Sequence, residues 1–129
     1  MVLSLSTVTL VVPDYDADIA YFTGILGFHL IADEPVSDTK RWVVVAPSPD
    51  APMRLLLARA ANAVQARAIG NQTGGRVFLF LETDDFAADH ARLSAAGVDF
   101  QEEPRHEVYG TVAVFADPFG NRWDLVEYT

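Results

Sequence analysis

Apolar and polar residues alternate along the first stretch of the chain, residues 3–12, with Val8, Leu10 and Val12 on one side. A period of two is typical of a β-strand that buries one face. Pro13 lacks the backbone donor that strand pairing uses, so the strand is expected to end there. The pattern therefore predicts that the chain opens with a strand whose apolar face packs against other elements.

The period then changes to three and four residues, which is typical of an amphipathic helix. Ile19 and Phe22 fall on one face of this helix, Asp14 or Asp16 precedes it as a cap, and Gly27 follows it as a stop signal. Three more strands are predicted in the first half, over residues 28–32, 41–46 and 53–58.

The same order of elements recurs in the second half. A strand is predicted over residues 76–83, Asp84 or Asp85 caps a helix, and Gly97 ends that helix. Further strands are predicted over residues 98–101, 111–115 and 122–128. Each half is therefore β-α-β-β-β, and the fold class is α+β.

The two halves, about 1–58 and 76–129, are joined by a linker over residues 59–75, which contains a predicted short helix and a Gly-rich turn. We predict a single domain of 1–129, because neither half alone has enough apolar residues for an independent core.

The faces of the strands opposite the apolar ones are mixed. They carry Thr7, Thr9, Val11, Arg76, Phe78, Phe80, Glu82, Arg122, Asp124 and Val126. A sheet face open to water normally has fewer large aromatic residues, whereas ligand sites combine apolar walls with a few polar groups. Two interpretations stay open, a cavity for a small molecule and a face covered by a second sheet or a partner subunit.

Asp124 is the main candidate within this face. It is predicted to be a buried anchor for a cationic or hydrogen-bonding ligand, or a general base whose pKa is raised by desolvation. The alternative is that Arg122, two residues away on the same face, forms an ion pair with it.

Aromatic residues supply the other candidates. Phe78, Phe80 and Trp42 offer stacking surfaces for a planar ligand, with core packing as the alternative. The pattern around Trp42 does not decide which strand face looks inward. His106 and Tyr109 belong to a predicted loop region that begins with residues 102–107 and leads toward the cavity.

Composition narrows the function classes. The net charge is −9, and a nucleic-acid-binding protein instead needs clustered Lys and Arg to neutralise phosphates. The absence of cysteine removes disulfides and thiolate sites. No apolar run reaches the roughly 18 residues needed to span a bilayer. We therefore expect a cytoplasmic protein with a small-molecule ligand and no nucleic-acid or membrane partner.

The residues Asp117-Pro118-Phe119-Gly120-Asn121, followed by Trp123-Asp124-Leu125, and the earlier Leu26-Gly27-Phe28 resemble the vicinal oxygen chelate superfamily over nearly the whole chain. That superfamily includes glyoxalases, dioxygenases and bleomycin-resistance proteins. The resemblance implies paired βαβββ modules that form a curved mixed sheet around a cleft, and it implies a homodimer.

Metal-dependent members hold a divalent ion on His, Glu or Gln from four strand positions. The resemblance places these positions at Thr7, Phe78, Asp124 and Leu55, or Met53 if the turn aligns differently. Only Asp124 is a plausible ligand, and about three protein ligands are needed. We therefore expect no metal and no cofactor.

The expected function is sequestration of an antibiotic or metabolite, as in bleomycin-resistance proteins. The alternative is an enzyme, either a glyoxalase-like lyase or isomerase or a dioxygenase. Such an enzyme would bind a metal through other residues or use Asp124 as a general base.

Overall fold

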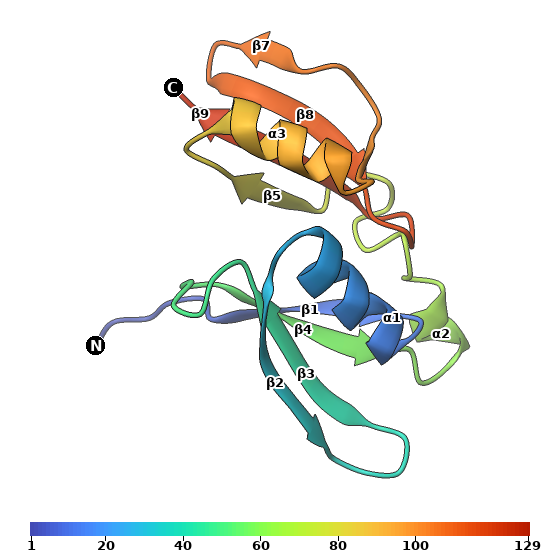
Figure 1. The fold of residues 1–129 in the computed structure, drawn as a ribbon. Helices are drawn as coiled ribbons and strands as arrows, with labels where there is room; N and C mark the ends of the chain where they lie inside the picture. Colours follow the sequence, from blue (N-terminus) through green and yellow to red (C-terminus); the bar gives the residue numbers. More distant parts are fainter. The chain divides into compact units, whose positions relative to one another are not determined.

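The computed structural model describes residues 1–129, which form two mixed β-sheets and a few helices (Figure 1). The chain divides into two compact units, residues 1–69 and 70–129, and their boundary lies within the linker predicted over residues 59–75. The α+β class is confirmed. That the two halves make one domain stays a prediction. None of the helices is long and apolar enough to cross a membrane.

The first unit has one four-stranded sheet, with the strands in the order β1-β4-β3-β2. Strand β1 is parallel to β4, and the other neighbours are antiparallel. The elements are β1 (Thr7–Val12), α1 (Tyr15–Ala20), η1 (Tyr21–Ile25), β2 (His29–Pro35), β3 (Arg41–Ala46), β4 (Arg54–Arg59) and α2 (Ala63–Ala66). All the elements predicted for this half are present, although β1 starts later than predicted and β2 runs further.

The first helix begins as expected and ends differently. The Asp14 side chain accepts a hydrogen bond from the Ala17 amide at 2.9 Å, which identifies Asp14 as the cap. From Tyr21 the α-helix widens into the π-helical segment η1. Phe22 within this segment and Leu26 directly after it are buried. An unbroken α-helix was therefore the wrong expectation, because the apolar spacing does not distinguish an α turn from a π turn.

The second unit repeats this plan with one addition. Its elements are β5 (Leu79–Glu82), α3 (Phe86–Ala95), β6 (Asp99–Phe100), β7 (Arg105–Glu107), β8 (Gly110–Ala116) and β9 (Arg122–Tyr128). The strand order is β5-β9-β8-β6, β5 is parallel to β9, and β7 pairs with β8. The loop predicted over residues 102–107 is wrong in part, since its last three residues form the strand β7.

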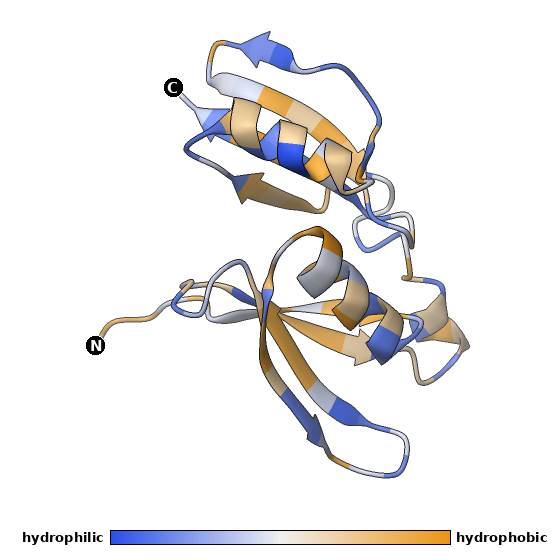
Figure 2. Cartoon of the chain, in the orientation of Figure 1, coloured by the Kyte–Doolittle hydropathy of each residue, from blue (hydrophilic) through white to orange (hydrophobic).

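Hydrophobic residues lie where the alternation predicted them. In Figure 2 the middle of β4 is hydrophobic, whereas β7 is hydrophilic throughout. Leu10 and Val12 in the first unit, and Trp123 and Leu125 in the second, are almost fully buried. The Trp123 ring stacks on Phe115 with centroids 5.7 Å apart, which joins β9 to β8. Each sheet therefore buries the apolar face predicted from the sequence.

The turn before β9 is organised by the buried carboxylate of Asp117. It accepts hydrogen bonds from the Phe119 and Asn121 amides, the Asn121 side chain and the Trp123 indole, at 2.9 to 3.3 Å. Gly120 in the turn has a φ of 97°, which glycine adopts readily. The turn thereby fixes the register of β9 and the face on which Asp124 lies.

Candidate ligand-binding site

Asp124 lies in the middle of the sheet of the second unit. Its register partners are Phe80 on β5 and Val114 on β8. The helix α3 belongs to the other face, because the Phe86 amide at its start donates to the Glu127 carboxylate at 2.7 Å. Glu127 alternates with Asp124 along β9, so Asp124 and Phe80 occupy the face of the sheet opposite α3. We call this the Asp124 face.

The Asp124 carboxylate is buried without being fully satisfied. The residue is 7% exposed, and its Oδ1 has no hydrogen-bond partner. Burial raises the pKa of Asp124, a positive charge on Arg105 opposes that shift, and Glu102 adds to it. A buried oxygen left in this state destabilises the free protein.

Arg122 does not form the ion pair that was the alternative interpretation of Asp124. Its guanidinium donates to the Gly75 carbonyl at 3.2 Å. Its charge still lowers the pKa of Asp124. The Asp124 carboxylate therefore has no ion pair with Arg122.

Aromatic surface lies beside this carboxylate. Phe80 is 62% exposed although its register partner is buried Asp124. Phe78 is half-buried, and its amide donates to the Arg122 carbonyl at 2.8 Å, which continues the pairing of β5 with β9. The structure thus places Phe78, Phe80, Arg122 and Asp124 on one face of the sheet.

Strand β7 adds residues that the sequence analysis missed. Arg105 is held by Glu102 at 2.9 Å and by Glu107 at 2.8 Å, and its register partner on β8 is Val112. This register places Arg105 on the Asp124 face. Residues Arg105–Glu107 include no apolar residue whose period would mark a strand, so they were interpreted as a loop.

The same alternation turns His106 away from Asp124. Its register partner is Thr111, and its Nδ1 lies 3.2 Å from the Thr111 hydroxyl, on the face that carries α3. Tyr109 lies in the turn after β7, half-exposed, with its ring 6.5 Å from that of Tyr128. The structure therefore does not bring His106 together with the other candidates.

The remaining candidates belong to the first unit. Thr7 and Thr9 are exposed on β1, and Thr9 pairs with Leu56. Leu55, the residue assigned to the metal position, is instead 7% exposed and pairs with Val8. Leu55 therefore lies on the buried apolar face, and Met53 precedes β4. The register expected for β4 was wrong by one residue, because the sequence pattern did not fix the length of the turn before this strand.

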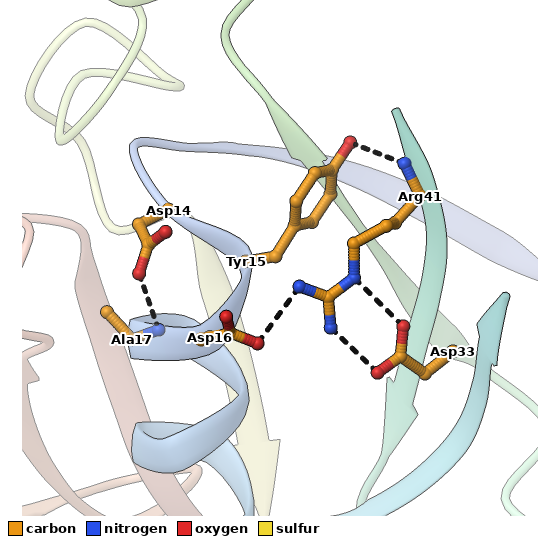
Figure 3. Close-up of polar contacts among 6 residues, drawn as sticks. All are labelled: Asp14, Tyr15, Asp16, Ala17, Asp33 and Arg41. Atoms are coloured by element: carbon orange, nitrogen blue, oxygen red, sulfur yellow. Dashed lines mark hydrogen bonds and ion pairs between the residues drawn. The ribbon is translucent and has the colours of Figure 1, made fainter. Parts of the chain in front are cut away.

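Trp42 on β3 is 46% exposed and lines a pocket of about 610 Å³ in the first unit. Arg41, its neighbour, points to the opposite face, where it contacts Asp33 and Asp16 while its amide donates to the Tyr15 hydroxyl (Figure 3). The direction of Trp42, which the pattern left open, is thus away from α1.

The residues present do not fit a divalent transition ion. No three His, Asp or Glu side chains lie close enough together to hold one. Phe80, the register partner of Asp124, and Leu56, which pairs with Thr9 in the first unit, offer no lone pair. His29 is exposed on the edge strand β2, and His90 packs between the rings of Phe86 and Phe100.

The chain belongs to the Glyoxalase/Bleomycin resistance protein/Dioxygenase superfamily, whose sequence pattern matches residues 4–125. An uncharacterised protein of Shewanella frigidimarina is 49% identical over 96% of this chain and 93% of its own length. The uncharacterised protein YetH of Bacillus subtilis is 27% identical over 98% of this chain and 100% of its own.

Solved structures share the fold. UcmS2 is 30% identical, with a TM-score of 0.84 and coverage of 98% of both chains. TnmS3, an antibiotic-binding protein from Streptomyces sp. CB03234, is 31% identical, with a TM-score of 0.74 over 100% of this chain and 99% of its own. The superfamily inferred from the Asp117 turn is therefore confirmed.

Proposed function

We propose that the protein binds and sequesters a small aromatic molecule on the Asp124 face, without a metal ion. The observation that carries the proposal is the pairing of a buried, unsatisfied carboxylate oxygen with an adjacent exposed phenyl ring. The unsatisfied oxygen destabilises the free protein, and the exposed ring offers a surface on which a planar ligand can stack. A single ligand that has both a ring and a donor group satisfies both.

The site defines the chemistry of this ligand. A planar ring would stack on Phe80, and an ammonium, N–H or O–H group would donate to the Asp124 carboxylate. Arg105 is held by two glutamates, so its guanidinium is already occupied and does not compete for the carboxylate. The similarity to TnmS3, which binds an antibiotic, supports a ligand of this kind.

Titration with 2-naphthylmethylammonium tests the proposal, with naphthalene-2-carboxylate as the probe of opposite charge. We expect the ammonium to bind more tightly. Phe80→Ala should weaken its binding about two- to tenfold, the range for one aromatic contact. Asp124→Asn should weaken it roughly 10- to 100-fold, because a charge-assisted hydrogen bond is lost.

The matched control is Val64→Ala, which shortens an exposed apolar side chain in the first unit. This variant should bind as the parent protein does. Unchanged affinity in both Phe80→Ala and Asp124→Asn would contradict the proposed site, and no binding by any ring compound with a donor group would contradict the proposed function.

The raised pKa of Asp124 favours a second candidate, an enzyme that uses this carboxyl as a general base. Mass spectrometry of the ligand after prolonged incubation separates the two functions. Sequestration returns the ligand unchanged, whereas a general base converts it at a rate that Asp124→Asn abolishes.

A cytoplasmic homodimer is part of the proposal, and light scattering after size exclusion tests the dimer. Elemental analysis of untagged protein tests its independence of metal. We expect less than one equivalent of any transition metal per chain, and a full equivalent would favour the metal-dependent alternative.

A further inference from the structure

The edge of β8 that faces away from β9 is paired with two different strands, and Val114 lies in the gap between them. Strand β6 pairs with β8 as far as Phe115, and β7 pairs with it up to Val112. In the gap, the Val114 amide donates to Oε1 of Glu102 at 3.1 Å, and its carbonyl accepts from the Gln101 amide at 2.9 Å. The Glu102 side chain thus takes the place of a strand neighbour at this point.

This contact fixes Glu102 beside the strand that adjoins Asp124. Val114 is the register partner of Asp124 on β9. Because both hydrogen-bonding groups of Val114 point away from β9, the two residues form a non-hydrogen-bonded pair, in which antiparallel strands approach most closely. Glu102 therefore lies only one strand beyond Asp124.

Glu102 in turn holds Arg105, whose side chain belongs to the Asp124 face. The Arg105 Nε donates to both oxygens of Glu102, at 2.9 and 3.0 Å, and its Nη1 donates to Glu107 at 2.8 Å. Charge-assisted bonds to two carboxylates fix the orientation of a guanidinium. Arg105 therefore presents a positive charge at a defined place on this face.

The other charged groups of the second unit on this face do not cancel that charge at Asp124. They are Arg76 before β5, Glu82 on β5, Glu102 and Glu107 around Arg105, and Arg122 on β9. Burial raises the pKa of Asp124, and among the charges Arg105 has the largest effect and lowers it. Glu102 raises this pKa and Arg122 lowers it. Without Arg105, burial and Glu102 would together oppose the ionisation of Asp124.

We infer that Arg105 is a positioning residue of this site, which keeps Asp124 ionised through a charge that Glu102 and Glu107 hold in place. The inference rests on the proposed function in one respect, since it takes Asp124 as the group that binds the ligand. An ionised carboxylate only accepts hydrogen bonds, which suits a cationic donor, whereas the protonated form is neutral. Arg105 therefore sets the pH range over which the site can hold a cation.

The ionisation of Asp124 can be measured without any ligand. In protein labelled with ¹³C at the Asp carboxyl carbons, the variant Asp124→Asn identifies the Asp124 signal, which is then followed as the pH is varied. We expect Arg105→Gln to move the midpoint of this titration to higher pH by about half a unit, the effect of one partly screened charge two strands, or about 10 Å, away. Arg105→Lys keeps the charge and should return the midpoint toward the parent value.

The matched control is Arg92→Gln, which removes an exposed positive charge from α3 on the other face of the sheet. This variant should titrate as the parent protein does. A midpoint that Arg105→Gln leaves unchanged, or that Arg92→Gln raises equally, would overturn the inference. If circular dichroism shows that Arg105→Gln does not fold, Arg105→Lys decides alone, since a raised midpoint despite the retained charge would also overturn it.

Ligand binding gives a second readout. Asp124 is protonated below its midpoint, so the affinity for 2-naphthylmethylammonium should fall there, and in Arg105→Gln the fall should begin at higher pH. An unchanged titration together with intact ammonium binding would contradict only the role of Arg105. Absence of ammonium binding at every pH would contradict the proposed function, while the ¹³C titration would still decide whether Arg105 keeps Asp124 ionised.

Discussion

The ionisation of Asp124 ties ligand binding to stability at the scale of single residues. Because burial raises its pKa in the folded state, the carboxylate form destabilises the fold at neutral pH. The raised value also means that the folded state is favoured as the pH falls toward the usual Asp range. A residue that lowers stability in the free protein is typical of a functional position.

We predict that Asp124→Asn stabilises the free protein by about 1 kcal/mol at pH 7, since it removes a buried charge whose Oδ1 has no partner. The gain should shrink as the pH falls through the raised pKa and vanish near the unfolded value. Urea unfolding between pH 4 and 8 measures it. Asp84→Asn, at an exposed position, is the control, and a pH-independent gain would contradict this account.

Residue alternation predicted Phe78, Phe80 and Asp124 as neighbours on one face, and the register of β5 and β9 places them so. Arg105 was missed, because the strand Arg105–Glu107 has no apolar residue whose period could reveal it. The hydrophobic pattern also could not fix the register of β4 to a single residue, since Leu55 and Leu56 are chemically alike.

Among the elements, the turn before β9 supports the site most directly. Asp117 accepts four hydrogen bonds there while 4% exposed. We predict that Asp117→Ala destabilises the protein by about 3 kcal/mol, because it leaves buried donors unpaired. Thermal unfolding measures the loss. Pro118→Ala, at an exposed position of the same turn, should cost far less, and equal losses would contradict the assigned role.

The same turn also packs against Gly70, the first residue of the second unit. Gly70 and Gly74 have φ values of 71° and 69°, but a Cβ would meet the Phe119 carbonyl only at Gly70. Gly74→Ala should therefore cost about 1 kcal/mol for its left-handed backbone alone. Gly70→Ala should cost clearly more, and chemical denaturation compares the two. Similar losses of stability in the two variants would show that Gly70 does not lie close to the Phe119 carbonyl.

Elements were more predictable than their ends or their type. Strong periodicity gave both helices and nearly every strand, because burial imposes it on the sequence. The π-helical segment Tyr21–Ile25 escaped prediction, since the four-residue spacing of Phe22 and Leu26 is compatible with an α turn as well as a π turn.

At the scale of the whole molecule, the repeat produced two sheets with different surfaces. The second unit presents an acid beside exposed phenyl surface, and the first presents an exposed indole on the face turned away from α1. The sequence predicted the repeat from landmarks such as Gly27 and Gly97. It did not predict the pocket beside Trp42, because the residues that line it come from several elements and share no period.

Calorimetric titration of chelator-treated protein with 2-naphthylmethylammonium, alongside Asp124→Asn, tests the central claim most directly. We predict that the parent protein binds the ammonium equally well with and without added Zn²⁺, and that the variant binds it roughly 10- to 100-fold more weakly. Binding that requires the metal ion, or that is indifferent to the loss of Asp124, would contradict the account.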